Sequence, residues 1–381
     1  MDKIGKTRIG ITGQSGFVGT HLHNMLGLDS SKYELIPFED SFFYSSELND
    51  FVKQCDVIVH LAAVNRHQDA DELYRVNINL VNLLIKSLEE ENVRPHLIFS
   101  SSIQENLENP YGKSKLEGKH LLEKWARKNQ ASFTGLIIPN VFGPFGLPNY
   151  NSFIATFCHK LTHDEKPSIN SDSNVNLIFV LSLCMQIISD INEVIEFTSP
   201  VIKEKSILPD FSQKVSEILN IFTVFKEQYF DQGIIPHITN INEINLFNTF
   251  RSYIDMDKYF PFMLKQNNDD RGNFVETIRL GIGGQVSFST TKPGITRGNH
   301  FHIRKIERFT VIKGKARIQL RRIGTDRIYE FYLDGEKPSY VDMPIWFTHN
   351  ITNIGNDDLY TQFWISEWYD AANPDTFFEK V

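Results

Sequence analysis

The sequence predicts an α/β chain with two domains: a doubly wound parallel sheet with a small substrate subdomain, followed by an all-β barrel. Three observations predict it. Strand-like and helix-like segments alternate through the N-terminal part, and a glycine loop joins the first strand to the first helix. From Phe262 onward, short alternating strands are separated by turn sequences at residues 268–272, 281–284 and 333–336. We therefore expect a first domain over residues 1–255 and a second over residues 256–381.

Composition argues against several classes of protein. The 381 residues are 41% hydrophobic, which is enough for two buried cores, and the net charge of -8 argues against nucleic acid as a partner. The longest uncharged stretch, Val175–Ser189, contains polar residues and falls short of a membrane span. Three scattered cysteines predict neither a disulfide framework nor a thiolate metal site: Cys55, Cys158 and Cys184. We expect a cytoplasmic protein that acts on a small ligand, without a membrane or nucleic-acid partner.

The glycine loop predicts a dinucleotide site. Residues 8–12 are strand-like and lead into Gly13, which permits a tight turn, while Gly16 lets the backbone approach a pyrophosphate. Gly19 allows close packing of the helix that follows, and the free amides at the start of that helix face the phosphate charge. The expected cofactor contacts of this loop are Gly13, Gly16, Phe17, Val18 and Gly19.

The next two strands add candidate cofactor contacts. Residues 33–38 form a second strand that ends at Glu39, a position where a carboxylate can accept a hydrogen bond from the ribose 2′-hydroxyl. An ordinary solvated loop acid is the other interpretation of Glu39. Residues 56–60 form a buried strand, and the side chains that follow it, Leu61 and Ala62, are expected to lie against the cofactor.

Ser102, Tyr111 and Lys115 are the candidate catalytic residues of the first domain. Tyr111 and Lys115 are four residues apart at the start of a helical segment, so they share one face. The Lys115 ammonium is expected to lower the pKa of the Tyr111 phenol, which then supplies a proton to a carbonyl oxygen as hydride arrives. Lys115 is also expected to hold the nicotinamide ribose, and Ser102 to hydrogen-bond the substrate oxygen. A Tyr-x-x-x-Lys pair by itself is usually helix surface, but here it follows a serine-ended strand and a glycine loop.

A second set of residues predicts a metal site in the barrel. His300 and His302 are two apart on a strand and share a face, while Glu307 follows and His349 comes from a distant strand. Three imidazoles and a carboxylate suit Zn²⁺ or another divalent transition metal. An isolated His-x-His is more often surface, but here it stands in a longer pattern: Gly294, His300, His302, Glu307, Gly314, Pro344, His349 and Asn353.

The first domain resembles the extended short-chain dehydrogenase/reductase family. The resemblance lies in residues 99–102, Phe-Ser-Ser-Ser, and in residues 138–144, Ile-Pro-Asn-Val-Phe-Gly-Pro, which border the nicotinamide in that family. It implies a Rossmann-type fold and NADPH or NADH as the cofactor. It also gives three candidate substrate contacts: Asn140, Asn149 and Asn151. Residues 177–183 depart from the acidic motif of many relatives, which leaves the details of the substrate subdomain open.

The second domain resembles the cupin family in both of its motifs, which implies a jelly-roll barrel. Trp346 stands where cupins usually have glycine, so we expect a differently built turn before His349. Residues 270–276 and 297–300 look like segments of the cupin sugar-nucleotide 3,5-epimerases, in which an Arg-Gly-x-Phe strand contacts the nucleotide-linked sugar. That likeness makes Arg271 and Arg297 candidate substrate contacts.

Over nearly its full length the chain resembles the CapF/WbjC family of capsule and O-antigen biosynthesis. The resemblance implies a bifunctional enzyme in which the cupin epimerises C3 of UDP-2-acetamido-2,6-dideoxy-4-hexulose. The reductase then reduces the C4 ketone with NADPH, on the path to UDP-N-acetyl-L-fucosamine. The expected partner is therefore a UDP-linked 4-keto-6-deoxy amino sugar, and the expected assembly is a homodimer.

Two alternatives stay open at the level of sequence. The chain is a single-function 4-keto-sugar reductase if the cupin is only a structural or ligand-sensing dimerisation module, because buried His and Glu side chains can also be satisfied core groups. A sugar-sensing transcription factor is the other alternative. It has little support, because the chain is acidic and shows no basic recognition helix.

Overall fold

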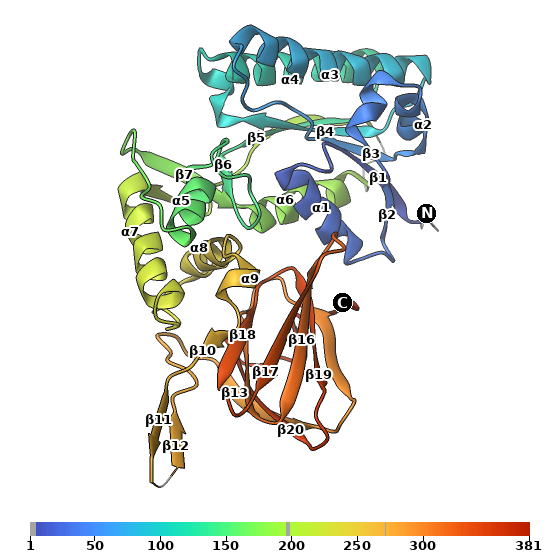
Figure 1. Cartoon of the computed structure of the whole chain (residues 1–381). Coiled ribbons are helices and arrows are strands. Elements are labelled where there is room, and N and C mark those ends of the chain that lie inside the picture. Colours follow the sequence, from blue (N-terminus) through green and yellow to red (C-terminus); the bar gives the residue numbers. More distant parts are fainter. Residues whose placement is uncertain (1–4, 196–198, 271) are drawn as a thin grey trace. The chain divides into compact units, whose positions relative to one another are not determined.

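The computed structural model describes residues 5–195, 199–270 and 272–381 and divides the chain into two compact units (Figure 1). The first unit runs to Phe142 and also includes Gly146–Ser152 and Ser173–Lys214. The second consists of Gly143–Phe145, Phe153–Asp172 and Val215–Val381. Among the described helices, none is both long and apolar enough to cross a bilayer.

The first unit contains a large sheet and a small one. The strands of the large sheet are β1 (Thr7–Thr12), β2 (Tyr33–Ile36), β3 (Val57–His60), β4 (His96–Ser102), β5 (Phe133–Ile138) and β8 (Ile202–Ser206). The small sheet consists of β6 (Asn140–Phe142), β7 (Asn174–Phe179) and β9 (Phe211–Lys214). The helices are α1 (Phe17–Gly27), η1 (Asp40–Tyr44), α2 (Glu47–Gln54), α3 (Ala70–Glu90), η2 (Ile103–Asn106), α4 (Pro110–Asn129) and α6 (Val180–Ile195).

The large sheet is parallel throughout, in the order β2-β1-β3-β4-β5-β8. Helices cover both faces: α2, α3 and α4 pack on one side, and α1 and α6 on the other (Figure 1). With both faces covered, β3 is buried along its whole length, as its unbroken apolar run requires. The strand order reverses beside β1, so the glycine loop after β1 lies at the point where such sheets bind ligands. The predicted Rossmann-type sheet is confirmed.

Among its described residues, the second unit contains helices, two five-stranded antiparallel sheets and a two-stranded hairpin. The helices are α5 (Phe153–Thr162), α7 (Val215–Phe225), η3 (Lys226–Phe230), α8 (Ile241–Arg251) and α9 (Met256–Tyr259). The strands are β10 (Phe262–Met263), β11 (Gln266–Asp269), β12 (Gly272–Val275), β13 (Gln285–Thr291), β14 (Thr296–Phe301), β15 (Glu307–Lys313), β16 (Lys315–Arg322), β17 (Ile328–Asp334), β18 (Ser339–Met343), β19 (Phe347–Asn353), β20 (Leu359–Ile365) and β21 (Phe377–Phe378).

The barrel consists of one sheet in the order β10-β18-β15-β20-β13 and another in the order β17-β16-β19-β14-β21. Alternate residues of β16, namely Ala316, Ile318 and Leu320, are fully buried and enter a core shared with β15, β18 and β19. The strands β11 and β12 form a separate hairpin (Figure 1). The predicted all-β C-terminal domain is confirmed.

A buried charged network ties the helices of the second unit to the barrel. Arg308 on β15 makes a bidentate pair with Asp342 on β18, at 2.7 Å from Nε to Oδ1 and 2.9 Å from Nη2 to Oδ2. The Tyr229 hydroxyl of η3 donates to Asp342 Oδ2 at 2.6 Å, and Arg251 of α8 donates to the Met343 carbonyl oxygen at 3.1 Å. These contacts group residues 215–251 with the barrel, whereas the sequence analysis placed them in the first domain.

We expect Asp342→Ala to lower the free energy of unfolding by about 3–5 kcal/mol, because it leaves the Arg308 guanidinium buried without its counter-charge. Urea denaturation followed by tryptophan fluorescence is the measurement, since three of the four tryptophans lie in the second unit: Trp346, Trp364 and Trp368. The exposed Asp326 provides the matched control, and Asp326→Ala should change the value by no more than about 0.5 kcal/mol. Equal stabilities of the two variants would contradict the importance of this network.

Candidate functional site

The glycine loop has the close contacts that a dinucleotide site needs. Gly13 has a φ of 70°, and a Cβ on it would lie 2.8 Å from the Ala62 amide nitrogen. A Cβ on Gly19 would lie 2.2 Å from the Gly13 carbonyl oxygen, so α1 approaches the loop as closely as its backbone allows. Gly16 precedes the first residue of α1, and its amide donates to the Gly13 carbonyl oxygen at 3.0 Å. These residues fit a pyrophosphate at the start of α1.

Two carboxylates follow β2, and they differ in their contacts. Asp40 Oδ2 lies 3.5 Å from the Ser15 hydroxyl oxygen, so the Asp40 carboxylate reaches the glycine loop. Glu39 is the residue that precedes η1, and it is exposed. The predicted second strand ends at Glu39-Asp40, and Glu39 is the residue that the sequence predicts as the contact to the ribose.

The turn that carries Ser102 packs against the start of α4, which carries Tyr111. Asn109 caps α4 by accepting a hydrogen bond from the Gly112 amide at 2.7 Å. A Cβ on Gly112 would lie 2.0 Å from the Gln104 carbonyl oxygen, so the helix touches η2 there. Ser102 precedes η2, and its hydroxyl oxygen accepts from the Gln104 amide at 3.2 Å. The structure thereby brings the predicted serine and tyrosine segments together.

Lys115 is buried, and its ammonium group is held by the end of β4. Its Nζ donates to the Ser100 carbonyl oxygen at 2.8 Å and lies 3.4 Å from the Ser100 hydroxyl. It also lies 5.7 Å from the centre of the Tyr111 ring, as the four-residue spacing predicts. Burial lowers the pKa of Lys115 to about 8. Sequence reasoning missed Ser100, although it belongs to the same Ser-Ser-Ser run as Ser102.

The pKa of the Tyr111 phenol is raised overall, whereas the sequence predicted that it would be lowered by Lys115. Burial, together with the neighbouring Tyr150 phenol, raises the pKa of Tyr111 to about 12. Burial disfavours the charged phenolate, and Lys115 directs its hydrogen bond to the Ser100 carbonyl oxygen. Tyr111 is therefore protonated at neutral pH, which is the state a proton donor requires.

The candidate substrate contacts of the first unit lie at its small sheet and the loop that follows β6. Asn140 is exposed at the start of β6 and donates to the Asn176 carbonyl oxygen at 3.3 Å. Arg66, in the segment after β3, donates to the Tyr150 carbonyl oxygen at 3.0 Å, between Asn149 and Asn151. Sequence reasoning missed Arg66, for which no local motif gave a signal.

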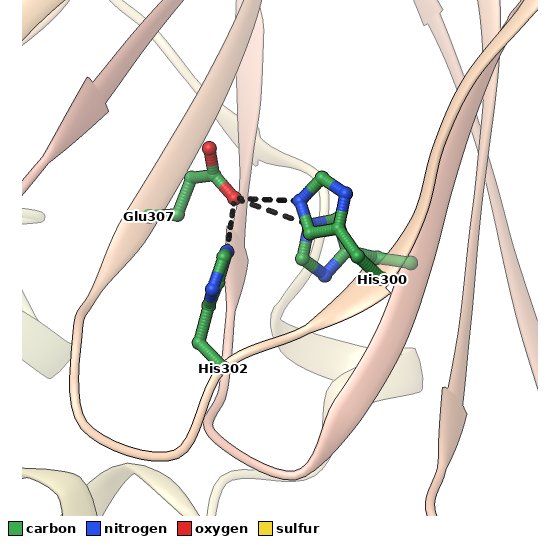
Figure 2. A group of neighbouring side chains, drawn as sticks. His300, His302 and Glu307 are labelled. Atoms are coloured by element: carbon green, nitrogen blue, oxygen red, sulfur yellow. Dashed lines mark hydrogen bonds and ion pairs between the residues drawn. The ribbon is translucent and has the colours of Figure 1, made fainter. Parts of the chain in front are cut away.

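The four predicted metal ligands converge in the barrel. The ligand atoms of His300, His302, Glu307 and His349 all lie within 4.8 Å of one another. Figure 2 shows the labelled imidazoles directed at the Glu307 carboxylate. Its Oε2 lies 3.0 Å from His302 Nε2, 3.1 Å from His349 Nε2 and 4.0 Å from His300 Nε2.

Strand pairing explains why these side chains meet. His300 on β14 pairs with His349 on β19, and the register shifts between Gly298 and His300. Burial and the neighbouring His349 lower the pKa of His300 to about 3, so its imidazole is neutral at pH 7. Neutral imidazoles and an ionised carboxylate are the forms that bind a divalent cation. The donor set and its geometry therefore fit one divalent metal ion.

Trp346 has a left-handed backbone conformation, with a φ of 64°, which is the region that glycine favours. Its amide donates to the His302 carbonyl oxygen at 2.8 Å, and its ring stacks on Phe301 with 5.5 Å between centroids. A side chain in this region costs roughly 1–2 kcal/mol, which burial of the indole offsets. The turn before His349 therefore keeps a glycine-like backbone, and the difference that we expected at this position lies in the side chain.

Of the two arginines predicted as substrate contacts of the barrel, the structure describes one, Arg297. Arg297 on β14 donates to the Thr291 hydroxyl and to the Thr290 carbonyl oxygen, each at 3.1 Å, so its described hydrogen bonds go to β13. Arg271 lies outside the described residues.

Comparison with known proteins agrees with this architecture. Residues 9–180 match the NAD-dependent epimerase/dehydratase family, and residues 267–377 match the polysaccharide biosynthesis C-terminal domain. A Pseudomonas aeruginosa protein, UDP-2-acetamido-2,6-beta-L-arabino-hexul-4-ose reductase, is 32% identical over 96% of this chain and 97% of its own length. The crystal structure of the capsular polysaccharide assembling protein CapF from Staphylococcus aureus is 35% identical, with a TM-score of 0.61 over 98% of this chain and 100% of that chain. The structure of CapF with the inhibitor 3-isopropenyl-tropolone covers the same shares at 32% identity and a TM-score of 0.55.

These matches first define a class: an NAD-dependent epimerase/dehydratase domain joined to a polysaccharide biosynthesis domain. Full-length identity above 30% to the two relatives narrows the class to one family. The chain belongs to the CapF family of capsular polysaccharide proteins.

We expect Asp40→Asn to raise the affinity for NADPH relative to NADH by roughly tenfold, and by more than Glu39→Gln does. A carboxylate close to the ribose repels the 2′-phosphate of NADPH, and such a charge pair near a surface is worth more than about 1 kcal/mol. Fluorescence titration of both variants with both cofactors gives the four dissociation constants. A larger shift for Glu39→Gln would restore the assignment made from sequence.

Proposed function

We propose that this protein is a bifunctional nucleotide-sugar enzyme of capsule or O-antigen biosynthesis. In this proposal the barrel epimerises C3 of UDP-2-acetamido-2,6-dideoxy-4-hexulose. The first unit then reduces the C4 ketone with NADPH or NADH, toward UDP-N-acetyl-L-fucosamine. The observation that carries the proposal is that one chain holds both a protonated Tyr111 beside a buried Lys115 and a cluster of three histidines with Glu307. The full-length similarity to a UDP-sugar ketone reductase supports the substrate class.

In the reduction, a bound nicotinamide would supply the hydride for C4. Tyr111 donates its phenolic proton to the C4 oxygen, so that the ketone becomes an alcohol. The high pKa of the phenol keeps that proton in place until the oxygen gains negative charge. Lys115 places a positive charge beside the ring and stabilises the phenolate that remains, and Ser102 donates a hydrogen bond to the substrate oxygen.

In the epimerisation, the C4 ketone acidifies the hydrogen on C3, which a base removes and solvent returns on the other face. A bound divalent cation, for which we propose Zn²⁺, would polarise the ketone oxygen and stabilise the enolate. His300, His302, Glu307 and His349 would hold that cation. Because a ketone is needed at C4 for this step, epimerisation precedes reduction.

One observation favours a rival in which the barrel does not catalyse. The Glu307 carboxylate lies 3.0 Å from His302 Nε2 and 3.1 Å from His349 Nε2, so contacts within the cluster can account for the buried carboxylate, although His349 Nε2 itself has no hydrogen bond among the described residues. The chain would then be a single-function 4-keto-sugar reductase, with a cupin that binds a ligand or dimerises. Exchange of the C3 hydrogen with solvent, measured by NMR of the keto sugar in D₂O without nicotinamide, distinguishes the two. A homodimer and a cytoplasmic location remain predictions from the sequence.

We expect Tyr111→Phe to slow ketone reduction by roughly 10²–10⁴-fold, because the proton donor is lost. The variant should still incorporate deuterium at C3, since that step uses the barrel. Cofactor oxidation followed by absorbance and NMR in D₂O measure the two steps in the full-length chain. Tyr74→Phe is the matched control, because the Tyr74 hydroxyl donates to the Glu117 carboxylate on the protein surface. The Tyr74→Phe enzyme should reduce the ketone at the wild-type rate. A normal rate of cofactor oxidation in Tyr111→Phe would reject the assignment.

We expect about one divalent metal ion per chain in the wild type, and a clear loss of metal in His349→Ala and in Glu307→Gln. Elemental analysis measures the metal content. Deuterium incorporation at C3 should fall in parallel with it. The first unit should still oxidise the cofactor when it is given a ketone substrate. His237→Ala is the control, because His237 bonds the Gly281 carbonyl oxygen outside the cluster. Full metal content in both cluster variants would rule out this ligand set, and an active metal-free wild type would separate the metal from catalysis.

A further inference from the structure

The turn between β14 and β15 carries one candidate ligand at each end, His302 and Glu307, and it is held by an aspartate from the C-terminal segment. The Asp375 carboxylate accepts hydrogen bonds from three consecutive amides of this turn, those of residues 303–305, at 3.0–3.1 Å. Asp375 is only 2% exposed, so it takes these hydrogen bonds in place of water. The turn thus wraps around a carboxylate that lies about 70 residues further along the chain.

Asp375 also contacts His302 itself. Its main-chain carbonyl oxygen lies 2.6 Å from His302 Nδ1, and a carbonyl oxygen only accepts hydrogen bonds, so Nδ1 must carry the proton. In the neutral imidazole the other ring nitrogen, Nε2, is then unprotonated, and it is the nitrogen that faces Glu307 (Figure 2). Asp375 therefore selects the tautomer in which Nε2 can bind a cation.

Several further contacts fix the C-terminal segment in place. Arg304 donates to Glu367 Oε1 at 3.0 Å and to the Asn373 carbonyl oxygen at 2.9 Å. Lys305 Nζ donates to the Pro374 carbonyl oxygen at 2.6 Å. On the other side of Asp375, β21 pairs with β14, with Phe378 opposite His300. The segment is thus attached both to the turn and to β14, the strand that carries His300.

We propose that Asp375 is a positioning residue of the metal centre. It fixes the Nδ1–H tautomer of His302 and holds the turn that sets the separation of His302 from Glu307. The inference rests on the proposed metal site, and it adds a residue from outside the cupin motifs to the groups that determine metal affinity.

Asp375→Asn tests this in the full-length chain, with Zn²⁺ as the probe and a chromophoric chelator as competitor. Asparagine tolerates the left-handed backbone of this position, where φ is 43°, but its amide group presents hydrogens to the amides of the turn. We expect zinc affinity to fall by about 10–100-fold, as for other partners of metal ligands. Asp370→Asn is the matched control and should keep the wild-type affinity, because exposed Asp370 bonds only the amide of Ala372 among the described contacts of its carboxylate.

A second measurement separates positioning from a general loss of folding. Imidazole ¹⁵N spectra of the zinc-loaded wild type should show His302 protonated at Nδ1 and bound through Nε2, with the signal assigned from His302→Gln. Thermal unfolding of the metal-free variants should show whether Asp375→Asn still folds. If it does not, the spectrum of the wild type alone decides the inference.

The outcomes separate this inference from the proposed function. A wild type that binds no zinc would reject the metal centre, and this inference with it. A wild type that binds zinc, with equal affinity in Asp375→Asn and Asp370→Asn, would reject the role of Asp375 alone. Zinc ligation through Nδ1 of His302 would do the same.

Discussion

The Glu307 carboxylate is buried at the start of β15. The arrangement of the candidate metal site follows from the need to bring polar partners to this carboxylate. Burial alone would raise the pKa of Glu307, but its contacts with the imidazoles of His302 and His349 lower it below its usual range. An ionised carboxylate in an apolar interior is tolerated only when it is paired in this way. The side chains of β14 and β19 must therefore meet β15 at one point, which requires the register shift at Gly298 and the tight turn at Trp346.

Lys115 in the first unit is also a buried ionisable group, but its partners are of a different kind. Its ammonium is as buried as the Glu307 carboxylate, yet its close partners, the Ser100 carbonyl and hydroxyl, are neutral. A neutral acceptor stabilises an ammonium less than a carboxylate does, so burial lowers the pKa of Lys115 to about 8. Lys119, one turn further along α4, is equally buried, but despite that burial the carboxylates of Glu105 and Glu204 raise its pKa. The two lysines thus differ in their partners: Lys115, the candidate catalytic residue, has neutral ones, and Lys119, a structural residue, has carboxylates.

The buried pair of Arg308 and Asp342 extends this constraint to the architecture of the second unit. Tyr229 and Arg251 come from helices that sequence reasoning assigned to the first domain, but their polar groups find partners at the barrel. A buried guanidinium needs several acceptors, and here the barrel provides them. The helices from residue 215 to 251 therefore pack as part of the barrel unit.

The sequence by itself determined the features that depend on local geometry. The glycine loop follows from local turn chemistry, and the spacing of Tyr111 and Lys115 follows from the helix period. His300 lies on β14 and His302 one residue beyond its end, so their two-residue spacing follows the strand period only approximately. The parallel sheet and the all-β second domain follow from the order and type of these segments. These features need no knowledge of what packs against them, which is why they could be predicted.

Only the tertiary structure decided what depends on burial and on distant partners. The pKa of Tyr111 is raised by burial and by the neighbouring Tyr150 phenol, and the spacing of Tyr111 and Lys115 does not reveal either cause. The Asp40 carboxylate reaches Ser15 of the glycine loop because of how the chain turns after β2. Asp375 reaches His302 across about 70 residues, with no motif to mark it. The physical reason is common to all three: solvation and hydrogen bonding are set by neighbours in space, and these neighbours are fixed only when the whole chain has folded.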